Sequence, residues 1–203
     1  MHDQDLPAAL AADVDGSFEQ MVLAFQDRLY AFALRLTGSP QDAEEITQDA
    51  FVRAYRALST YPDSRIRGMA LRPWLYRITL NIFRNRVRNR PLQLVPLDHE
   101  SEAGELVLED DKEARPEAAL QHAELTKSLD RLVAALPERY RLAVVLRHIQ
   151  GLGYGEMAAI LKQPIGTIKA NVHRGVRLLR EAFDEQEHIG RARPQRQARR
   201  GRK

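Results

Sequence analysis

The sequence contains no cysteine among its 203 residues, which excludes a disulfide scaffold, thiolate metal sites and a cysteine nucleophile. Its apolar runs are short: Leu132–Leu136 and Leu142–Leu146 hold five residues each, whereas a bilayer span needs about 20. The N-terminus carries four aspartates in its first 15 residues instead of a basic start and a long apolar stretch, so no secretory signal is evident. We therefore expect a cytoplasmic protein without membrane insertion.

Signatures of catalysis are also missing. The six histidines are scattered without the spacing of metal ligands, and no Walker-type phosphate loop occurs. Many of the acidic residues gather in one central stretch, away from the basic segments. We therefore expect a protein that is not an enzyme, with no catalytic residues, no metal site and no cofactor.

What the chain does have is strongly segregated charge. The formal net charge of +3 is the balance of −6 over residues 1–62, +7 over 63–90, −8 over 91–130 and +10 over 131–203. Two basic blocks separated by acidic ones indicate two polyanion-binding surfaces on two modules. The alternative is a solvated helix face in each block, which is less favoured because both blocks end a helical pattern.

Apolar residues recur at helical spacing, and no strand-period alternation or internal repeat stands out. The expected fold is all-α, with two small helical domains joined by a flexible acidic linker and a helix-turn-helix in the C-terminal domain. We expect a disordered N-terminal tail, a first domain, the linker, a second domain and a basic C-terminal tail, at residues 1–16, 17–90, 91–117, 118–185 and 186–203.

Apolar stripes and helix-capping residues predict where the individual helices begin and end. In the first domain one helix starts near Phe18 and stops at Gly38, and a second is capped by Ser39. The expected helices after Gly38 are 40–58, 73–89, 118–135, 137–149, 154–161 and 165–185, with a loop at 61–72.

The segment from Gly151 to Phe183 has the pattern of a helix, a tight turn and a second helix. The second helix carries apolar residues on one face and Lys, His and Arg on the other, which suits insertion in a major groove. The alternative is a plain helical hairpin with a solvated basic face. The candidate DNA-contacting residues are Thr167, Lys169, Ala170, Asn171, His173, Arg174 and Arg177.

The helix over 73–89 shows a polar stripe without any acid, surrounded by apolar and aromatic residues. Asparagine is a weak helix former but can hydrogen-bond a base edge, so the stripe indicates nucleic-acid contact; the alternative is an exposed stripe that serves solubility. Trp74 beside it is better explained as core than as a base-stacking residue. The stripe consists of Arg77, Asn81, Arg84, Asn85 and Arg88.

The helix over 40–58 has an acidic face if Ile46 and Ala50 point inward. Such a face next to a DNA-contacting stripe would repel DNA, so it indicates a protein partner; the alternative is charge balance at a helix N-terminus. Its residues are Glu44, Glu45, Gln48, Asp49 and Arg53.

With these residues in view, the chain resembles the RNA polymerase sigma factors of the extracytoplasmic-function type. Four motifs in the family's order carry the resemblance. They are Ala43-Glu44-Glu45-Ile46-Thr47-Gln48-Asp49-Ala50-Phe51, Trp74-Leu75-Tyr76-Arg77-Ile78 with Asn81, Leu136-Pro137-Glu138-Arg139-Tyr140-Arg141, and Pro164-Ile165-Gly166-Thr167-Ile168-Lys169 through His173-Arg174.

The resemblance implies roles for both domains. The first would bind the polymerase β′ clamp through the acidic face and would read and open the −10 element through the stripe, together with Ser64 and Arg65 of the preceding loop. The second would dock on the β flap and read the −35 element. The implied partners are core RNA polymerase, promoter DNA and an anti-sigma factor that holds the protein until a signal releases it.

The chain departs from the family pattern at several positions. Lys162 stands where a turn glycine is common, so the turn is expected to differ, because a non-glycine residue is unfavourable at positive φ. Ala170 replaces a frequent serine, and the loop from Ser64 to Arg72 is longer and richer in arginine than usual. Residues 191–203 add seven positive charges, which favour non-specific phosphate contact or merely solubility.

Two other functions compete with a sigma factor. An autonomous helix-turn-helix regulator would need a ligand-binding or receiver domain, and residues 17–90 carry neither signature. An enzyme that acts on nucleic acid would need metal carboxylates or an acid–base pair near a basic face, and none is found. The sequence favours the sigma factor.

Overall fold

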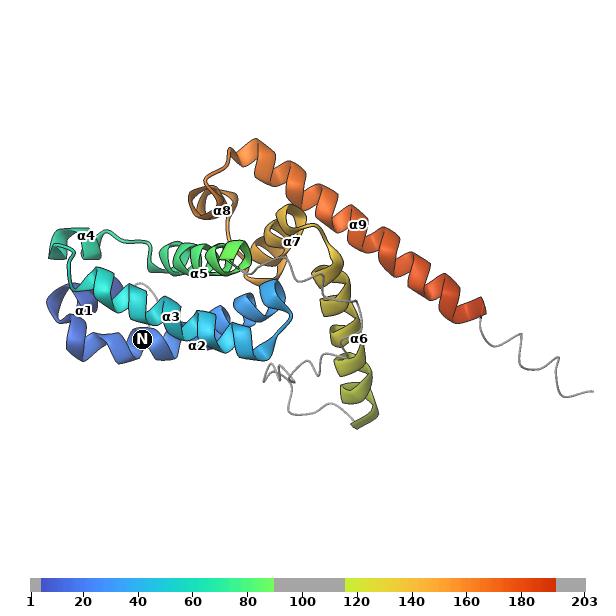
Figure 1. Cartoon of the computed structure of the whole chain (residues 1–203), viewed down its shortest axis with the longest axis horizontal. Helices are drawn as coiled ribbons and strands as arrows, with labels where there is room; N and C mark the ends of the chain where they lie inside the picture. Colours follow the sequence, from blue (N-terminus) through green and yellow to red (C-terminus); the bar gives the residue numbers. More distant parts are fainter. Residues whose placement is uncertain (1–4, 90–115, 193–203) are drawn as a thin grey trace, which may run out of the picture.

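The structure is a computed structural model that describes residues 5–89 and 116–192. Every regular element in these two ranges is a helix, which confirms the all-α expectation (Figure 1). We refer to residues 5–89 as the N-terminal unit and to residues 116–192 as the C-terminal unit. The expected linker falls almost wholly on residues outside the described ranges.

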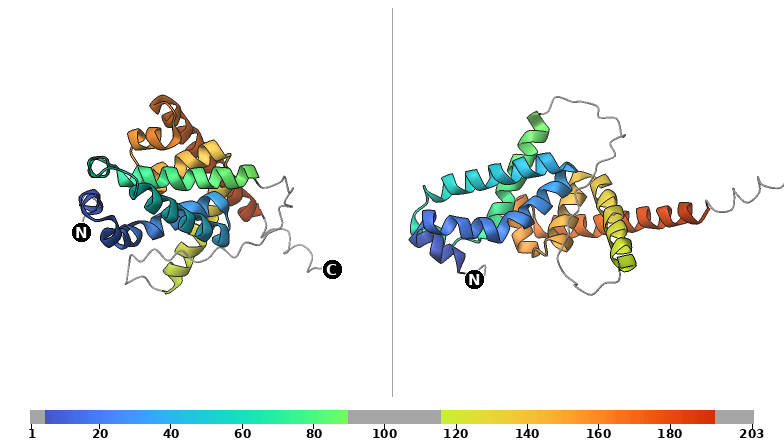
Figure 2. Two further views of the ribbon diagram at one scale, coloured as in Figure 1. Left: turned by 60° about the vertical axis from the view of Figure 1, so that its left-hand side comes forward. Right: turned by 90° about the horizontal axis from the view of Figure 1, so that it is seen from below.

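The N-terminal unit has three long helices, with two short helices at one end. Its elements are α1 (Leu6–Ala12), α2 (Val14–Thr37), α3 (Pro40–Leu58), α4 (Asp63–Arg67) and α5 (Leu71–Asn89). Of the long helices, α2 and α3 lie antiparallel and α5 crosses them (Figures 1 and 2).

Local sequence explains where α2 and α3 begin and end. The Asp13 carboxylate accepts a hydrogen bond from the backbone N–H of Gly16 at 3.0 Å and caps α2. At the other end Gly38 has φ +68°, a conformation that a residue without Cβ adopts readily. Ser39 then caps α3 by accepting from the N–H of Asp42 at 3.3 Å, as the sequence predicts.

The expected disordered tail at 1–16 is wrong for the residues that the structure describes. Leu6 and Leu10 lie one helical turn apart in α1 and are buried against the rest of the unit. Alanine-rich sequence favours the helix, and α1 packs on both α2 and α4. A short amphipathic helix was missed because its partner is α4, which lies about 55 residues further along the chain.

The expected loop at 61–72 also contains structure. Residues 63–67 form α4, and Ile66 is 1% exposed in the core next to α1. One buried side chain in a five-residue helix gives no periodic pattern, so the sequence could not reveal it.

The C-terminal unit contains four α-helices and a turn of π-helix. Its elements are α6 (Pro116–Ala135), α7 (Glu138–Val144), the π-helix (Val145–Ile149), α8 (Tyr154–Leu161) and α9 (Ile165–Ala192). The expected helix-turn-helix is formed by α8 and α9. Helix α9 continues past the expected end at 185 and projects from the unit (Figure 1), so residues 186–192 belong to it and the rest of the expected basic tail lies outside the described residues.

The two units share a contact in this structure. Helix α5 packs against α8, and the end of α2 packs against α6. A single continuous cluster of buried apolar residues includes side chains of both units. Figure 2 shows α8 and α9 close to the N-terminal unit from two further directions.

Candidate nucleic-acid interface

The outer face of α9 is the first basic surface. Thr167, Lys169, Ala170, His173, Arg174 and Arg177 are all exposed on it, and Asn171 is half-buried. Ile168 and Val172 on the opposite face are buried against the unit. Ile165 is apolar but 46% exposed, because it lies at the very start of the helix. The face therefore offers two hydroxyl or amide groups and four cationic or imidazole groups to a partner.

An aromatic ring supports one cation of this face. The Lys169 Nζ lies 5.5 Å from the centre of the Tyr154 ring, and the Arg147 guanidinium lies 4.8 Å from the same ring. Arg147 also donates to the carbonyl of Leu152 at 3.0 Å. Cation–π contacts of this kind hold cations next to one another against their mutual repulsion. The start of α8 thus contributes to the basic surface of α9.

The turn between α8 and α9 keeps a left-handed residue although no glycine is present. Lys162 adopts φ 53° and ψ 46°, so the expectation that this turn differs from a glycine turn is wrong. The packing of α8 and α9 imposes the conformation, and Lys162 bears the steric cost of its Cβ.

Replacement of Lys162 by glycine should raise the free energy of unfolding by about 0.5–1 kcal/mol, because the relief of Cβ strain exceeds the extra chain entropy of glycine. Urea denaturation followed by circular dichroism would measure it. Lys162→Ala keeps the Cβ and serves as control, with no gain expected. Equal stability of the glycine and alanine variants would show that the turn carries no strain.

The stripe on α5 is the second basic surface. Asn81, Arg84, Asn85 and Arg88 are exposed and Arg77 is half-buried. The Arg88 guanidinium donates to the Asn85 side-chain oxygen at 3.2 Å, so part of the stripe is ordered by its own members.

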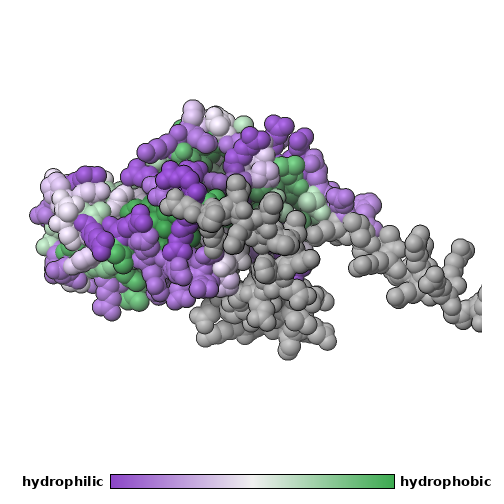
Figure 3. All heavy atoms as spheres, viewed as in Figure 1, coloured by the Kyte–Doolittle hydropathy of each residue, from purple (hydrophilic) through white to green (hydrophobic). Residues whose placement is uncertain are grey.

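The sides of α5 next to the stripe are mostly buried, as the sequence predicts. Trp74 is 7% exposed and Leu75 and Leu80 are fully buried, which confirms the core interpretation of Trp74. Val87 is an apolar exception that is 53% exposed near the end of the helix. Figure 3 shows apolar patches between hydrophilic ones on one face of the molecule.

The two candidate residues that precede α5 lie on α4. Ser64 and Arg65 are exposed, and the Arg65 guanidinium lies 3.6 Å from the centre of the Tyr61 ring. The Tyr61 ring in turn lies 6.3 Å from the ring of Trp74. Arg65 is thereby held over an aromatic platform at the end of the N-terminal unit that also carries the start of α5.

The acidic face of α3 is exposed but partly engaged. Glu44, Glu45, Gln48 and Arg53 are exposed and Asp49 is half-buried, while Ile46 and Ala50 point inward as expected. Asp49 accepts two hydrogen bonds from Arg53, at 3.0 and 2.9 Å. Gln48 donates to the Glu44 carboxylate at 3.2 Å.

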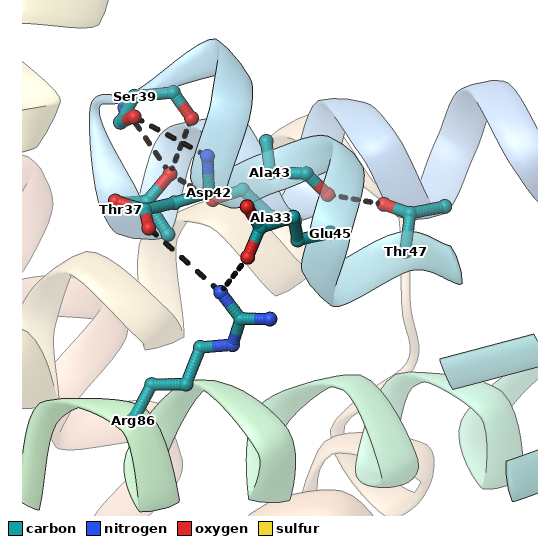
Figure 4. A network of polar contacts seen from close by, with 8 residues as sticks. All are labelled: Ala33, Thr37, Ser39, Asp42, Ala43, Glu45, Thr47 and Arg86. Atoms are coloured by element: carbon teal, nitrogen blue, oxygen red, sulfur yellow. Dashed lines mark hydrogen bonds and ion pairs between the residues drawn. The ribbon is translucent and has the colours of Figure 1, made fainter. Parts of the chain in front are cut away.

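One arginine outside the predictions ties the acidic face to α5. Arg86 reaches across from α5, and its Nη1 lies 2.7 Å from a carboxylate oxygen of Glu45 and 3.8 Å from one of Asp42 (Figure 4). A hollow of about 610 Å³ lies between α3 and α5 here and is lined by Ser39, Gln41, Asp42, Glu45, Asp49, Arg53, Ile82, Asn85 and Arg86. The acidic face and the α5 stripe therefore meet at one hollow.

Sequence reasoning missed three further positions. They are Arg86, which joins α5 to the acidic face, Gln150, which accepts a hydrogen bond from Tyr76 of the N-terminal unit, and Gly175, where α9 packs closely on α7. Arg86 lies off the stripe, and Gln150 has no neighbouring pattern that marks it. Gly175 could have been noticed in the sequence, because a glycine inside a helix costs about 1 kcal/mol relative to alanine. A glycine at such a position therefore indicates a structural role such as close packing.

No cluster of three or more potential metal ligands occurs within residues 5–89 and 116–192, and no helix in the described part of the chain is long and apolar enough to cross a membrane.

Two sequence profiles match this chain. The profile of Sigma-70 region 2 matches residues 21–91, and that of Sigma-70 region 4 matches residues 126–179. The first covers most of α2 and all of α3 to α5, and the second covers most of the C-terminal unit including the basic face of α9. Both candidate nucleic-acid surfaces therefore lie inside matched segments.

Curated relatives agree with the profiles. The chain is 34% identical over 81% of its length to the ECF RNA polymerase sigma factor SigE of Mycolicibacterium smegmatis, of which it spans 61%. It is 32% identical over 81% of its length to SigW of Bacillus subtilis, covering 88% of that protein. It is 31% identical over 90% of its length to the sigma-E factor of Escherichia coli, covering 92% of it.

Solved structures show the same fold. The sigma factor RpoE from Bartonella quintana, in complex with the anti-sigma factor NepR, matches with a TM-score of 0.60 and 26% identity over 82% of this chain and 96% of that one. CnrH, in complex with the cytosolic domain of CnrY, matches with a TM-score of 0.59 and 23% identity over 90% of this chain and 97% of that one. The chain belongs to the extracytoplasmic-function family of RNA polymerase sigma factors, which are promoter-specific transcription initiation factors.

Proposed function

We propose that this protein binds core RNA polymerase through α3 and directs it to promoters by reading two DNA elements, one with each unit. The observation that carries the proposal is the presence of two exposed basic helix faces, on α5 and α9, on separate units of one chain. Each face lies on a helix whose other sides are buried, so each is presented on a rigid support.

The outer face of α9 is assigned to the −35 element, read as duplex. Its hydroxyl, amide and cationic groups can reach base edges and phosphates in a major groove. The α8–α9 turn and the Tyr154 ring support the geometry of this face.

The double variant Lys169→Ala and Arg174→Ala should weaken binding to a −35 duplex by about 1–3 kcal/mol for each base contact that is lost. Polymerase binding should not change. Fluorescence anisotropy at fixed salt would measure the affinity, and Arg131→Ala, an exposed arginine on α6, serves as control. Equal affinity of the double variant and the wild type would remove these residues from the site.

The α5 stripe and the Arg65 platform are assigned to the −10 element. Asn81 and Asn85 are exposed amides that can both donate to and accept from an unpaired base, whereas the arginines suit phosphates. The hollow between α3 and α5 brings this element close to the polymerase-binding face.

The acidic face of α3 is assigned to core polymerase. Negative charge beside a DNA-contacting stripe disfavours nucleic acid as its partner and favours a basic protein surface. The assignments of the β′ clamp to this face and of the β flap to the C-terminal unit follow the family's pattern.

An anti-sigma factor is the proposed regulator. Support comes from the RpoE relative, which was solved together with an anti-sigma factor and matches this chain over most of its length. A cytoplasmic location and the lack of enzymatic activity are part of the same proposal, because core polymerase and DNA are the partners and no catalytic constellation is required.

The proposal is tested by adding the purified chain to core polymerase and a linear library of promoter fragments. Specific transcripts that depend on the chain are expected. An autonomous helix-turn-helix regulator would bind DNA without converting core polymerase to specific initiation, and a nuclease or another enzyme would change the DNA itself. Either of those results would overturn the proposal.

A further inference from the structure

The contact between the two units, where α5 packs on α8 and α2 on α6, is called the seam below. A group of buried polar contacts lies in the seam, and none of their residues belongs to a proposed DNA-contacting face. The hydroxyl of Tyr76 on α5 donates to the side-chain oxygen of Gln150 at 2.5 Å. Arg72, one turn earlier on α5, donates through Nη2 to the backbone carbonyl of the same glutamine. Tyr76 is fully buried and Gln150 is 8% exposed. Gln150 is thus bound at both its side chain and its backbone by the other unit.

Each partner in this contact is anchored in its own unit. The Tyr76 ring packs edge-on against Phe32 of α2, with the ring centres 5.0 Å apart. Burial raises the pKa of Tyr76 to about 12, so the hydroxyl keeps its proton and remains a donor. Gln150 directly follows the π-helix and donates its backbone N–H to the Val145 carbonyl at 2.9 Å. The contact therefore joins two preformed structures.

The rest of the seam combines buried apolar contacts between the two units with weaker polar ones. Ion pairs join Arg35 to Asp130 at 3.2 Å and Arg84 to Glu138 at 3.3 Å. The Arg84–Glu138 pair is exposed on both sides and contributes little, whereas the Arg35 side chain is largely buried. A hollow of about 390 Å³ lies between α5, α7 and α8. Within the described residues, the buried Nε of Arg72 and the buried side-chain oxygen of Gln163 have no hydrogen-bond partner. Unpaired buried polar atoms favour opening, because water would satisfy them.

The closed arrangement conflicts with the proposed reading of two promoter elements. Elements at −35 and −10 are separated by roughly 25 base pairs, or about 85 Å of duplex at about 3.4 Å per base pair. In the structure α5 packs directly against α8, whose turn leads into α9. The two reading helices therefore cannot reach both elements while the seam is intact.

We propose that Arg72, Tyr76 and Gln150 form a latch that keeps the free chain closed, and that the latch must open before the chain can engage both promoter elements. The inference rests on the proposed function. The latch acts by fixing the separation of the two faces and not by covering them, since Asn81 and Asn85 on α5 and Arg174 on α9 are exposed in the closed state. Polymerase and promoter DNA open it because both bind the extended chain better.

Because the chain has no natural cysteine, two introduced cysteines can be cross-linked selectively across the seam. The cross-link can then be cleaved in the same sample. Cysteines are introduced at Arg35 and Asp130, which face each other across the seam, and are joined by a short bis-methanethiosulfonate linker that a reductant cleaves. With core polymerase and promoter DNA in thiol-free buffer, the locked chain should give at least tenfold fewer specific transcripts than the same chain after cleavage.

The control is the same linker placed inside the N-terminal unit. Asp15 and Tyr55 contact each other across α2 and α3 at 2.7 Å, so the variant with cysteines at these two positions is linked without bridging the seam. It should give the same transcript level before and after reduction. Equal transcription from the locked and the cleaved Arg35–Asp130 variant would overturn the latch.

A second measurement does not depend on transcription. Gln150→Ala removes the acceptor of Tyr76, and the radius of gyration of the full chain in small-angle scattering should increase. Promoter affinity with core polymerase should rise by about three- to tenfold as the open fraction grows. Gln26→Ala, an exposed glutamine on α2, should match the wild type. An unchanged radius of gyration in Gln150→Ala would overturn the latch, whereas an absence of transcripts from the wild type would overturn the proposed function alone.

Discussion

Replacement of Gly175 by valine should lower the free energy of unfolding of this protein by about 2–3 kcal/mol, the range of strong overpacking in a core. Gly175 lies on the inner side of α9 where this helix crosses α7. A Cβ at this position would lie 2.6 Å from a methyl carbon of Val144 and 3.2 Å from the backbone carbonyl oxygen of Tyr140. The backbone atom cannot move aside without shifting α7, so the close approach of the two helices depends on the missing side chain.

The same substitution at Gly155 is a matched control. A Cβ there meets no atom within 4 Å, and the residue is exposed on α8, so Gly155→Val should change stability by less than about 0.5 kcal/mol. Urea unfolding monitored at 222 nm would compare the two variants. If Gly175→Val unfolds at the urea concentration of the wild type, the close crossing of α7 and α9 is not a feature of the folded protein.

Reversal of charge on the acidic face should abolish co-purification with core polymerase, with a loss of affinity greater than tenfold. The suitable positions are Glu44 and Gln48, both changed to lysine, because they are exposed and interact only with each other among the contacts described for them. Like charges placed against a basic partner cost several kcal/mol. Glu45 is less suitable because it binds Arg86 of α5, so its reversal would also disturb the packing of α3 on α5. Asp49 is less suitable because it binds Arg53 of its own helix.

The control carries the same change of charge elsewhere. Glu19 and Gln26 are exposed on α2, and their replacement by lysine should leave polymerase binding intact. Both double variants should unfold within about 0.5 kcal/mol of the wild type, as is usual for surface substitutions. Normal recovery of core polymerase by the Glu44→Lys and Gln48→Lys protein would remove this face of α3 from the interface.

The candidate surfaces were largely predictable because the residues of each surface lie mainly on a single helix. A face of α9 or α5 repeats every three or four residues, so its polar members can be read without knowledge of the fold. Arg77 is the partial exception, since it is half-buried in the structure.

The positions that escaped prediction all depend on residues far along the chain. The seam joins Tyr76 to a glutamine 74 positions later, and Arg86 meets Glu45 from 41 positions away. No local pattern encodes such pairs. Lys162 shows the reverse case, in which local preference argues against a left-handed turn and the packing of α8 and α9 imposes it.

The sequence by itself determined the helical class, the bounds of most long helices, the two basic faces, the acidic face and the family motifs, because helix periodicity, caps and charge are local properties. Only the tertiary structure decided that α1 docks on α4, that α7 and α9 cross at Gly175, and that the two units meet at Gln150. These features depend on surfaces that become neighbours only when the chain is folded, and their energies come from burial and from hydrogen bonds between distant residues.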